Sequence, residues 1–403
     1  MKIAVPKEIM AGERRVALVP ESAARLVAAG HHVLVETGAG AHAYIDDLAY
    51  AGAQVVPDPH TLYAHAELVL KVRAPARHPT HDYDEIALLR EGTLLIALLQ
   101  PLSAPERMRR LAARGVTSFS LDVLPRITRA QGMDALSSMS TVAGYRAALL
   151  GATLLGKFFP LLMTAAGTVT PARVLVLGAG VAGLQAIATA RRLGAIVQAF
   201  DTRAVVREQV QSLGASFLSV PLDEETAADA GGYARELSEE SYARERELLR
   251  DVVREADVVI TTAVVPGARA PVLLSAEMVA AMRPGSVIVD LAAEAGGNCA
   301  LTEPGHRVVA HGVLIEGPLN LPATMPVDAS RLYSRNLLAF VTHLLAHGVV
   351  IDEQTGSRQL NLDDEIVRST CITHAGQILH RATLERCVAT KGASPSDERQ
   401  PSA

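Results

Sequence analysis

The sequence has few cysteines and no cluster of basic residues, and each absence excludes a class of protein. Its three cysteines, Cys299, Cys371 and Cys387, have neither CxxC nor Cys/His ligand spacing and cannot all pair. They argue against a zinc site and a disulfide framework, and they favour a reducing compartment. With 38 basic against 43 acidic residues, the chain lacks the basic surface that nucleic-acid phosphates demand. We therefore expect no metal site and no nucleic-acid partner.

The sequence also lacks an uninterrupted apolar segment of membrane-spanning length. The opening MKIAVPKE has no apolar stretch long enough for a signal peptide and predicts a short strand. Between Ala147 and Thr170 the only charge is Lys157, but Pro160 stops a helix that starts near Thr141. A Lys at the centre of a span costs about 2.5–3.5 kcal/mol. We predict a buried interdomain helix here, no direct membrane span, and a cytoplasmic chain.

The rest of the composition is typical of a globular protein with two cores. Apolar residues make up 49% and charged residues 20% of the 403, which is enough chain for two average domains. Short apolar strands alternate with helical patterns from KIAV to TSFSLD and again from ARVLVLG to GVLIEG. Such alternation indicates parallel sheets. The sequence predicts an α/β protein with two Rossmann-like, doubly wound domains and mostly parallel sheets.

The apolar helix pattern at Ser330–Leu345 is long enough to return the chain to its first domain. We therefore predict a discontinuous N-terminal domain around a second domain, followed by a Ser-, Pro- and charge-rich disordered tail. The predicted ranges are 1–140 plus 325–385, 141–324, and 391–403. Within the second domain, the charged stretch from Asp223 to Arg250 is too long for an ordinary strand connection and indicates an insertion.

A Gly-rich turn joins the first strand of the second series to its helix. Gly178, Gly180 and Gly183 have GxGxxG spacing between ARVLVL and LQAIATARRLGA. Gly178 allows the tight turn, Gly180 lets the backbone approach a pyrophosphate, and Gly183 permits close packing of helix on strand. The amides of Val181 and Ala182 then face the diphosphate at the positive end of the helix. The context predicts a dinucleotide site, with a ligand-free tight turn as the alternative.

Asp201 closes the next strand and selects the kind of dinucleotide. Its carboxylate can accept both ribose hydroxyls of the adenosine, and its charge repels a 2′-phosphate, so NAD(H) is favoured over NADP(H). Thr202 and Arg203 follow as further cofactor-binding candidates, and the basic Arg203 qualifies that preference. Val264, after the strand ADVVITTA, lies where such sheets flank the adenosine. An ordinary loop residue is the alternative for Val264.

The sequence offers no evident base for oxidising an alcohol or amine. Such a dehydrogenase needs a proton acceptor near the nicotinamide, most often His or Lys. The 13 histidines fit surface or helix-face positions. A polar loop instead supplies four side chains that can orient a nicotinamide and its ribose: Arg126, Gln131, Asp134 and Ser137. The alternative is a capped helix start, with Asp134 or Ser137 as the N-cap.

That loop, LPRITRAQGMDALSS, resembles the signature loop of the NAD(H)-binding subunit of proton-translocating nicotinamide nucleotide transhydrogenases. The segments VLGAGVAGLQAIATARRLGA, AGGYARELSEE and GSVIVDLAAEAGGNC resemble that family's second domain, and PKE…GERRVALVP resembles its first. The likeness extends to about residue 385. The opening and the dinucleotide turn are shared with alanine dehydrogenases, which carry a His after the strand corresponding to TLLIALL and a Lys near ELVLKV. This chain has Gln100 and Arg73 there.

The resemblance implies hydride transfer from NADH on this chain to NADP⁺ on a partner subunit, which needs proximity and orientation but no general base. It implies that Arg126 and Gln131 position the nicotinamide and its ribose, and that Gln131 also touches the incoming NADP ribose. Asp134 would hold Arg126, and Ser137 would bind the carboxamide.

In the charged insertion, Gly232 and Tyr233 correspond by this resemblance to a mobile loop that closes over the nucleotide, with a plain surface hairpin as the alternative. The implied assembly is a homodimer joined to NADP(H)-binding and membrane-spanning subunits, at the cytoplasmic face of the inner membrane. Because the sequence ends in a polar tail, we expect the membrane portion on another subunit. The competing hypotheses are a soluble alanine-type dehydrogenase and a non-catalytic NAD-sensing module.

Overall fold

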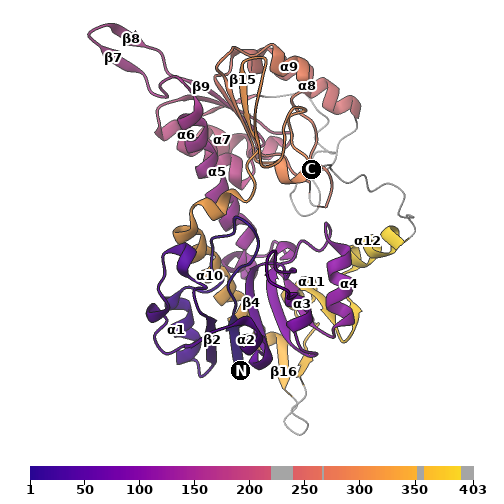
Figure 1. Ribbon diagram of the computed structural model, residues 1–403. Helices are drawn as coiled ribbons and strands as arrows, with labels where there is room; N and C mark the ends of the chain where they lie inside the picture. Colours follow the sequence, from indigo (N-terminus) through magenta and orange to yellow (C-terminus); the bar gives the residue numbers. More distant parts are fainter. Residues whose placement is uncertain (219–238, 266, 352–357, 392–403) are drawn as a thin grey trace. The chain divides into compact units, whose positions relative to one another are not determined.

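The computed structural model describes residues 1–218, 239–265, 267–351 and 358–391, which fold into two compact units (Figure 1). Unit 1 comprises Met1–Leu136 with the described residues from Pro326 onward, and unit 2 comprises Ser137–Met325. Each unit is built on one mostly parallel sheet with helical connections, which confirms the predicted α/β fold class.

The described residues of unit 1 form a sheet of eight strands. In sheet order the strands are β19 (Gln377–Ile378), β18 (Cys371–His374), β6 (Thr117–Ser120), β5 (Leu94–Leu98), β4 (Leu68–Arg73), β1 (Lys2–Val5), β2 (His32–Glu36) and β3 (Gln54–Val56). Pairing is parallel from β6 to β3 and antiparallel at β18 and β19. A separate antiparallel pair joins β16 (Val349–Ile351) to β17 (Arg358–Leu360).

The helices of unit 1 begin at residues that suit helix starts. They are α1 (Pro20–Ala28), α2 (Pro59–His65), α3 (Glu85–Leu88), α4 (Pro105–Ala113), α10 (Pro326–His343), α11 (Glu365–Thr370) and α12 (Arg381–Lys391). Proline opens α1, α2 and α4, where its missing N–H costs no hydrogen bond. Asp58 caps α2 by accepting the amide of Thr61 at 2.9 Å. A π-helical turn, Leu344–Gly348, follows α10.

The described residues of unit 2 form a sheet of seven strands. In sheet order these are β11 (Ser216–Leu218), β10 (Ile196–Phe200), β9 (Arg173–Leu177), β12 (Val258–Thr261), β13 (Val287–Asp290), β15 (Val313–Glu316) and β14 (Arg307–Ala310). Pairing is parallel except between β14 and β15. The helices here are α5 (Ala135–Leu154), which begins in the last residues of unit 1, α6 (Val181–Arg192), α7 (Arg207–Ser212), α8 (Glu239–Glu255) and α9 (Ala276–Ala280).

The sheet of unit 2 is buried on both faces, because alternate strand residues point into two different cores. Val174 and Val176 of β9 pack with Ile187 of α6 in one core. Leu175 and Leu177 of the same strand lie in the other core, which includes side chains of α8 and α9. This arrangement explains why these strands have continuous apolar sequences. It also fixes the ends of the strands, from which the loops of the candidate site leave.

The apolar run from Ala147 to Thr170 differs from its prediction. The helix α5 begins at Ala135 instead of near Thr141, and it ends at Leu154. The chain then forms an antiparallel hairpin of β7 (Leu162–Thr164) and β8 (Gly167–Val169). The predicted helix is therefore present but begins earlier and ends six residues before Pro160, and the hairpin after Pro160 was not predicted. No helix in the described ranges is long and apolar enough to cross a membrane.

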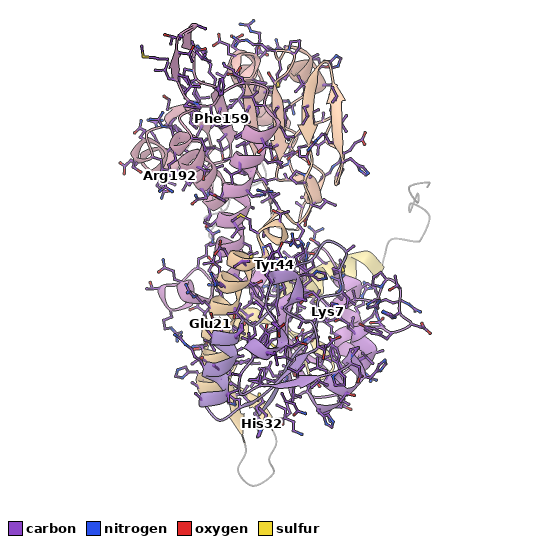
Figure 2. All side chains as sticks on the ribbon, turned by 60° about the vertical axis from the view of Figure 1, so that its left-hand side comes forward. Lys7, Glu21, His32, Tyr44, Phe159 and Arg192 are labelled. Atoms are coloured by element: carbon purple, nitrogen blue, oxygen red, sulfur yellow. The ribbon has the colours of Figure 1, made fainter. Side chains whose placement is uncertain are left out.

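The hairpin lies at the surface of unit 2. Met163 is 84% exposed, and Figure 1 shows β7 and β8 projecting beyond the rest of their unit. Phe159, labelled in Figure 2, is buried in the core of the unit just before the hairpin starts. Gly167, with φ of +114°, begins β8 directly after the two-residue turn, and β-branched Thr164, Thr168 and Val169 favour strands. Apolar composition alone did not reveal these strand and turn preferences.

At the C-terminus, Lys391 is the last residue of α12 and does not begin a disordered tail. Residues 392–403 of the predicted tail lie outside the described residues. Of the predicted insertion, Asp223 to Arg250, the part up to residue 238 also lies outside them, and its helix-like run lies in α8.

Candidate functional site

The Gly-rich turn of unit 2 has a geometry that requires glycine at two of its positions. Gly178 has φ of +97°, a conformation that side chains rarely adopt. A Cβ on Gly183 would lie 1.9 Å from the carbonyl oxygen of Gly178, so the first turn of α6 rests directly on the end of β9. The turn is therefore held tightly between strand and helix. This is the backbone shape that brings amide groups close to a diphosphate.

The first turn of α6 carries the predicted phosphate-binding amides. Gly180 is the N-cap residue and makes no side-chain capping bond, and Val181 and Ala182 begin the helix. Amides in the first turn have no partner within their own helix and lie at its positive end. A Cβ on Gly144 of α5 would lie 2.0 Å from the carbonyl oxygen of Ala182. The helix α5 thus packs against this turn and holds it in place.

The turn lies where the strand order of unit 2 reverses. The chain passes from β9 outward to β10 and β11, and then returns to β12 on the other side of β9. Ligands of open α/β sheets bind at such a switch point, beyond the carboxyl ends of the strands. Thr262, directly after β12, donates its hydroxyl to the carbonyl oxygen of Gly178 at 3.0 Å. This residue was missed from sequence, although its position after a strand end was visible.

Asp201 follows β10 and is bound to the same turn. Its Oδ2 accepts the amide of Ala179 at 2.7 Å, which ties the end of the second strand to the Gly-rich turn. Its Oδ1 accepts the amide of Arg203 at 2.9 Å. The guanidinium of Arg203 also bonds both carboxylate oxygens. Thr202 is half-buried between them. The structure thus brings together Asp201, Arg203 and the glycine turn.

The loop after β12 is held by a buried asparagine that was not predicted. Val264 in this loop is 45% exposed. Asn298 accepts the amide of Ala263 at 3.0 Å and donates to the carbonyl oxygen of Ala263 at 2.8 Å. Asp290 in turn accepts the amide of Asn298 at 2.8 Å. Asn298 thus fixes the residue next to Val264, and it comes from a segment far along the chain.

The predicted polar loop of unit 1 leaves the carboxyl end of β6. Arg126 and Gln131 are exposed. Asp134 directly precedes α5, and Ser137 lies inside the first turn of that helix. The alternative that Ser137 is an N-cap is therefore wrong, whereas Asp134 has the N-cap position. Asn336 of α10 donates its amide to the carbonyl oxygen of Gly132 at 2.9 Å, which fastens the loop beside Gln131.

Arg73 ends β4, and Gln100 follows the end of the neighbouring β5 by two residues, at the same edge of the sheet as this loop. Arg73 lies 3.5 Å from the buried carboxylate of Glu13. Gln100 has φ of +52°, and its backbone amide donates to Oδ2 of Asp122 at 2.7 Å. Burial raises the pKa of Asp122 despite its hydrogen bonds. These positions hold a guanidinium and a carboxamide, neither of which is a base near neutral pH.

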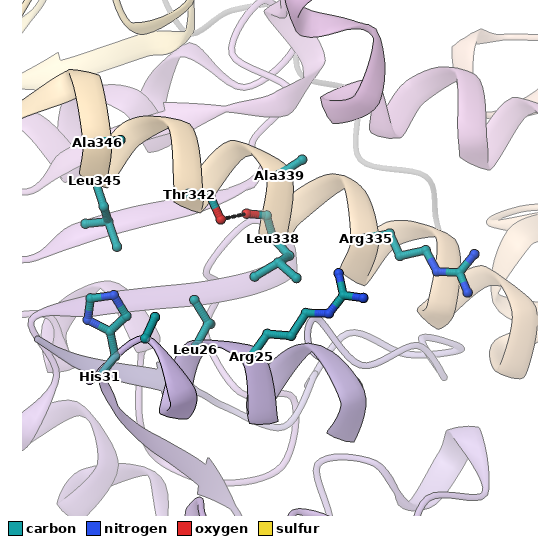
Figure 3. Close-up of a pocket in the computed structure, with 10 residues that line it drawn as sticks. Arg25, Leu26, His31, Arg335, Leu338, Ala339, Thr342, Leu345 and Ala346 are labelled. Atoms are coloured by element: carbon teal, nitrogen blue, oxygen red, sulfur yellow. Dashed lines mark hydrogen bonds between the residues drawn. The ribbon is translucent and has the colours of Figure 1, made fainter.

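A hollow of about 640 Å³ lies elsewhere in unit 1, between α1 and α10 (Figure 3). Leu26 and Leu338 line its apolar wall, with Arg25 and Arg335 toward one end and His31 at the other. None of the predicted site residues lines it.

In the described ranges of the chain, no cluster of three or more His, Cys, Asp or Glu residues is placed to hold a metal ion. Gly232 and Tyr233 lie outside the described residues.

Comparison with known proteins identifies the family. Models of the two domains named alanine dehydrogenase/PNT match this chain, the N-terminal one at residues 4–143 and the C-terminal one at residues 147–381. The chain belongs to the alanine dehydrogenase/PNT family. It is 49% identical to an NAD(P) transhydrogenase subunit alpha chain of Rhodospirillum rubrum, over 95% of this chain and 98% of that protein.

Identity to the alanine dehydrogenase of Bacillus subtilis is lower, at 32% over 87% of each chain. Among solved structures, the transhydrogenase from Sinorhizobium meliloti superposes with a TM-score of 0.80 at 38% identity, covering 95% of this chain and all of that one. Within the family, this chain is thus more similar to these transhydrogenases than to that alanine dehydrogenase.

Proposed function

We propose that this chain is the NAD(H)-binding alpha subunit of a proton-translocating NAD(P) transhydrogenase, and that it passes hydride from NADH to NADP⁺ held on a partner subunit. Two observations carry the proposal: unit 2 has a complete dinucleotide turn, and unit 1 has Gln100 and Arg73 where the alanine dehydrogenases carry a His and a Lys. The 49% identity to a transhydrogenase subunit supports the same assignment.

The residues of unit 2 are suited to NAD(H). The turn at Gly178 and Gly183 leaves no room for a side chain, so backbone amides can approach a diphosphate. Asp201 can accept ribose hydroxyls in exchange for the bonds that it now accepts from the guanidinium of Arg203. Val264 supplies exposed apolar surface at the switch point. When bound, the nicotinamide supplies the transferable hydride.

The residues of the polar loop and of the start of α5 orient the nicotinamide and do not react with it. Arg126 and Gln131 present a guanidinium and a carboxamide at the surface of the polar loop. In this proposal they hold the nicotinamide and its ribose, with Asp134 next to them and Ser137 on the carboxamide. Asn336 keeps the loop backbone in place through Gly132. Because hydride passes directly between two rings, the chain has no proton to remove, and fixed hydrogen bonds supply proximity and orientation.

We further propose that the chain acts as a homodimer, with NADP(H)-binding and membrane-spanning partners, at the cytoplasmic face of the membrane. Exposed apolar residues of the β7–β8 hairpin and its approach support a protein contact, because Met163 in β7 and Leu161 just before it are 84% and 55% exposed. Met163→Glu should place a charge in that contact and shift the chain toward monomer in analytical ultracentrifugation. An unchanged dimer would remove the hairpin from the interface, and Val309→Glu, at another exposed site of unit 2, is the control.

The function is tested with purified protein in two assays. The chain alone, given NADH, pyruvate and ammonia, should oxidise no NADH, whereas an alanine dehydrogenase would. Addition of an NADP-binding transhydrogenase partner should start NADPH formation from NADH and NADP⁺. Alanine production by the chain alone would overturn the proposal in favour of an alanine-type dehydrogenase. Nucleotide binding without turnover beside any active partner would indicate a sensing module.

A further inference from the structure

Asp364 links the polar loop of unit 1 to the helix α10. Its Oδ2 accepts a hydrogen bond from Nη1 of Arg129, in the loop, at 3.2 Å. Its Oδ1 lies 3.0 Å from Nε2 of His343, the last residue of α10. The side chains of Asp364 and His343 are each 10% exposed, whereas that of Arg129 is 60% exposed. A mostly buried carboxylate thus joins an exposed side chain of the loop to α10.

The carboxylate of Asp364 is also held by the helix that it caps. Asp364 is the N-cap of α11, and its Oδ1 accepts the amides of Ile366 at 2.9 Å and of Val367 at 3.1 Å. The side chains of both residues are fully buried. Burial raises the pKa of Asp364, but hydrogen bonds from His343, Val367 and Arg129 outweigh burial and lower it to about 2. The carboxylate is therefore ionised at neutral pH, where it accepts hydrogen bonds from His343 and Arg129.

The polar loop is attached on both sides of Gln131. Arg129, two residues earlier, is bound to Asp364, and Gly132, directly after, accepts the side-chain amide of Asn336 at 2.9 Å. Gln131 itself is exposed between these two attachments. Because the attachments come from α11 and α10, those helices fix the backbone from which the side chain of Gln131 extends. Supports of this kind keep a functional side chain in its productive orientation.

The alternative role for the Asp364–Arg129 pair is that of an ordinary surface ion pair. Exposed pairs contribute little to folding stability, because solvent screens the charges and long side chains lose entropy when they pair. Breaking this pair should therefore change the stability of unit 1 very little in either role. The rate of hydride transfer is more sensitive, since a small misplacement of an orienting group slows a reaction that depends on proximity. That rate distinguishes a positioning role from an ordinary ion pair.

We propose that Asp364 is a positioning residue for hydride transfer, which holds Arg129 and, with it, the backbone that presents Gln131 to the nicotinamide. His343 and the first amides of α11 keep the carboxylate in place. This proposal rests on the proposed function, in which Gln131 orients the nicotinamide and its ribose. Asp364 touches neither nucleotide and acts only through the loop.

The test measures hydride transfer from NADH to NADP⁺ by stopped-flow absorbance, with the full chain and its NADP-binding partner. Asp364→Asn keeps an oxygen that can cap α11 but removes the charge that holds Arg129. Transfer at saturating NADH should slow by about fivefold, as expected for the loss of one exposed ion pair. NADH affinity, measured by calorimetry, should stay within about twofold. Asp58→Asn makes the same exchange at the cap of α2, where the acceptor bonds go to Thr61, and should leave the rate unchanged.

Two double variants test the path from Asp364 to Gln131. Asp364→Asn with Arg129→Ala should be no slower than the slower single variant, because both substitutions break the same pair. Asp364→Asn added to Gln131→Ala should cause little further slowing, since the side chain to be positioned is already absent. Arg129→Lys keeps the charge and should transfer hydride faster than Arg129→Ala. Circular dichroism checks the folding of each variant.

A normal transfer rate in Asp364→Asn would overturn the proposal, as would an undiminished loss when that change is added to Gln131→Ala. Equal rates in Arg129→Lys and Arg129→Ala would also contradict it. Loss of NADH affinity in step with the rate would indicate a generally loosened unit and would likewise overturn the positioning role. If the unchanged chain forms no NADPH beside an active partner, the proposed function fails instead, so the two failures are distinguishable.

Discussion

The sheets of unit 1 and unit 2 share the order of their first five strands but differ in what occupies the crevice where that order reverses. In unit 2 the crevice lies beyond β9 and β12, and it holds Gly178 and the hydroxyl of Thr262. In unit 1 it lies beyond β1 and β4, and Glu8 accepts the amide of Val72 there at 2.6 Å. A glycine turn leaves backbone amides accessible to a ligand, whereas the buried carboxylate of Glu8 accepts a hydrogen bond from the amide of Val72.

The crevice of unit 1 is filled by buried charges. The ammonium of Lys71 is fully buried, 2.7 Å from Glu85 and 3.3 Å from Glu8. Tyr63 donates its hydroxyl to Glu85 at 2.9 Å. Burial raises the pKa of Glu8 although Lys71 opposes the shift. The comparison teaches that strand order gives a place for a ligand, and that the residues after the strands decide whether the place is open.

Of the substitutions that test this comparison, Lys71→Met should have the largest effect, and the quantity it changes is the free energy of unfolding. It leaves Glu8 and Glu85 buried without their cation, which should cost about 3–5 kcal/mol of unfolding free energy. Urea unfolding followed by circular dichroism measures the loss, and NADH affinity of the remaining folded protein should be unchanged. Arg77→Ala removes an exposed ion pair with Asp82 and should cost about 0–1 kcal/mol. Equal losses in the two variants would refute the structural role of Lys71.

Gly183→Ala tests the open crevice of unit 2, where it should weaken NADH binding. The added Cβ would lie 1.9 Å from the carbonyl oxygen of Gly178, so the turn must open. We expect NADH binding to weaken by about a hundredfold, since overpacking of this kind costs about 1–3 kcal/mol. Gly156→Ala is the control, because its Cβ would meet nothing within 4 Å. Unchanged NADH affinity in Gly183→Ala would argue that the turn holds no dinucleotide.

The contrast between these sites also shows what could be predicted from sequence. Gly178, Gly183 and Asp201 were found because their spacing along one strand, turn and helix encodes the geometry. Thr262 and Asn298 were not found, because their contacts join segments that are far apart in sequence. The fold class followed from alternating strand and helix patterns, which depend on local periodicity.

The ion cluster of Lys71, Glu8 and Glu85 was not predicted for the same reason, since its three members come from three separate segments. The start of α5 was misplaced because a helix start depends on the chain before it, and Ala135 follows a short 3-10 helix, Thr128–Met133. The hairpin after α5 was not predicted, because an apolar run by itself does not distinguish a strand from a helix.

Asn298→Ala tests the loop after β12 in unit 2, and its expected effect on NADH affinity is smaller. It removes the bonds that hold both backbone groups of Ala263, next to Val264. Loosening this loop should weaken NADH binding by about tenfold, from the loss of fixed hydrogen bonds. Fluorescence titration of NADH provides the measurement. Ser275→Ala, which removes the cap of α9 in the same unit, should leave NADH affinity as it was. A similar effect in both variants would indicate general loosening of the unit.

Gln131→Ala has the smallest expected effect on binding and acts on unit 1. NADH affinity should stay within about twofold, while the rate of hydride transfer falls about tenfold because orientation is lost. Stopped-flow absorbance with the NADP-binding partner measures the rate of hydride transfer separately from NADH binding. Thr128→Ala, in the same 3-10 helix, is the control. A normal transfer rate in Gln131→Ala would retire its positioning role.

The central claim is that NADH on unit 2 gives its hydride directly to a second nicotinamide, without a proton acceptor on this chain. NADH carrying deuterium at its transferable position tests the claim most directly, with the chain, its NADP-binding partner and NADP⁺. The account predicts that the deuterium appears in NADPH and that none is released to water. Deuterium in the solvent, or in alanine when pyruvate and ammonia are supplied, would contradict it.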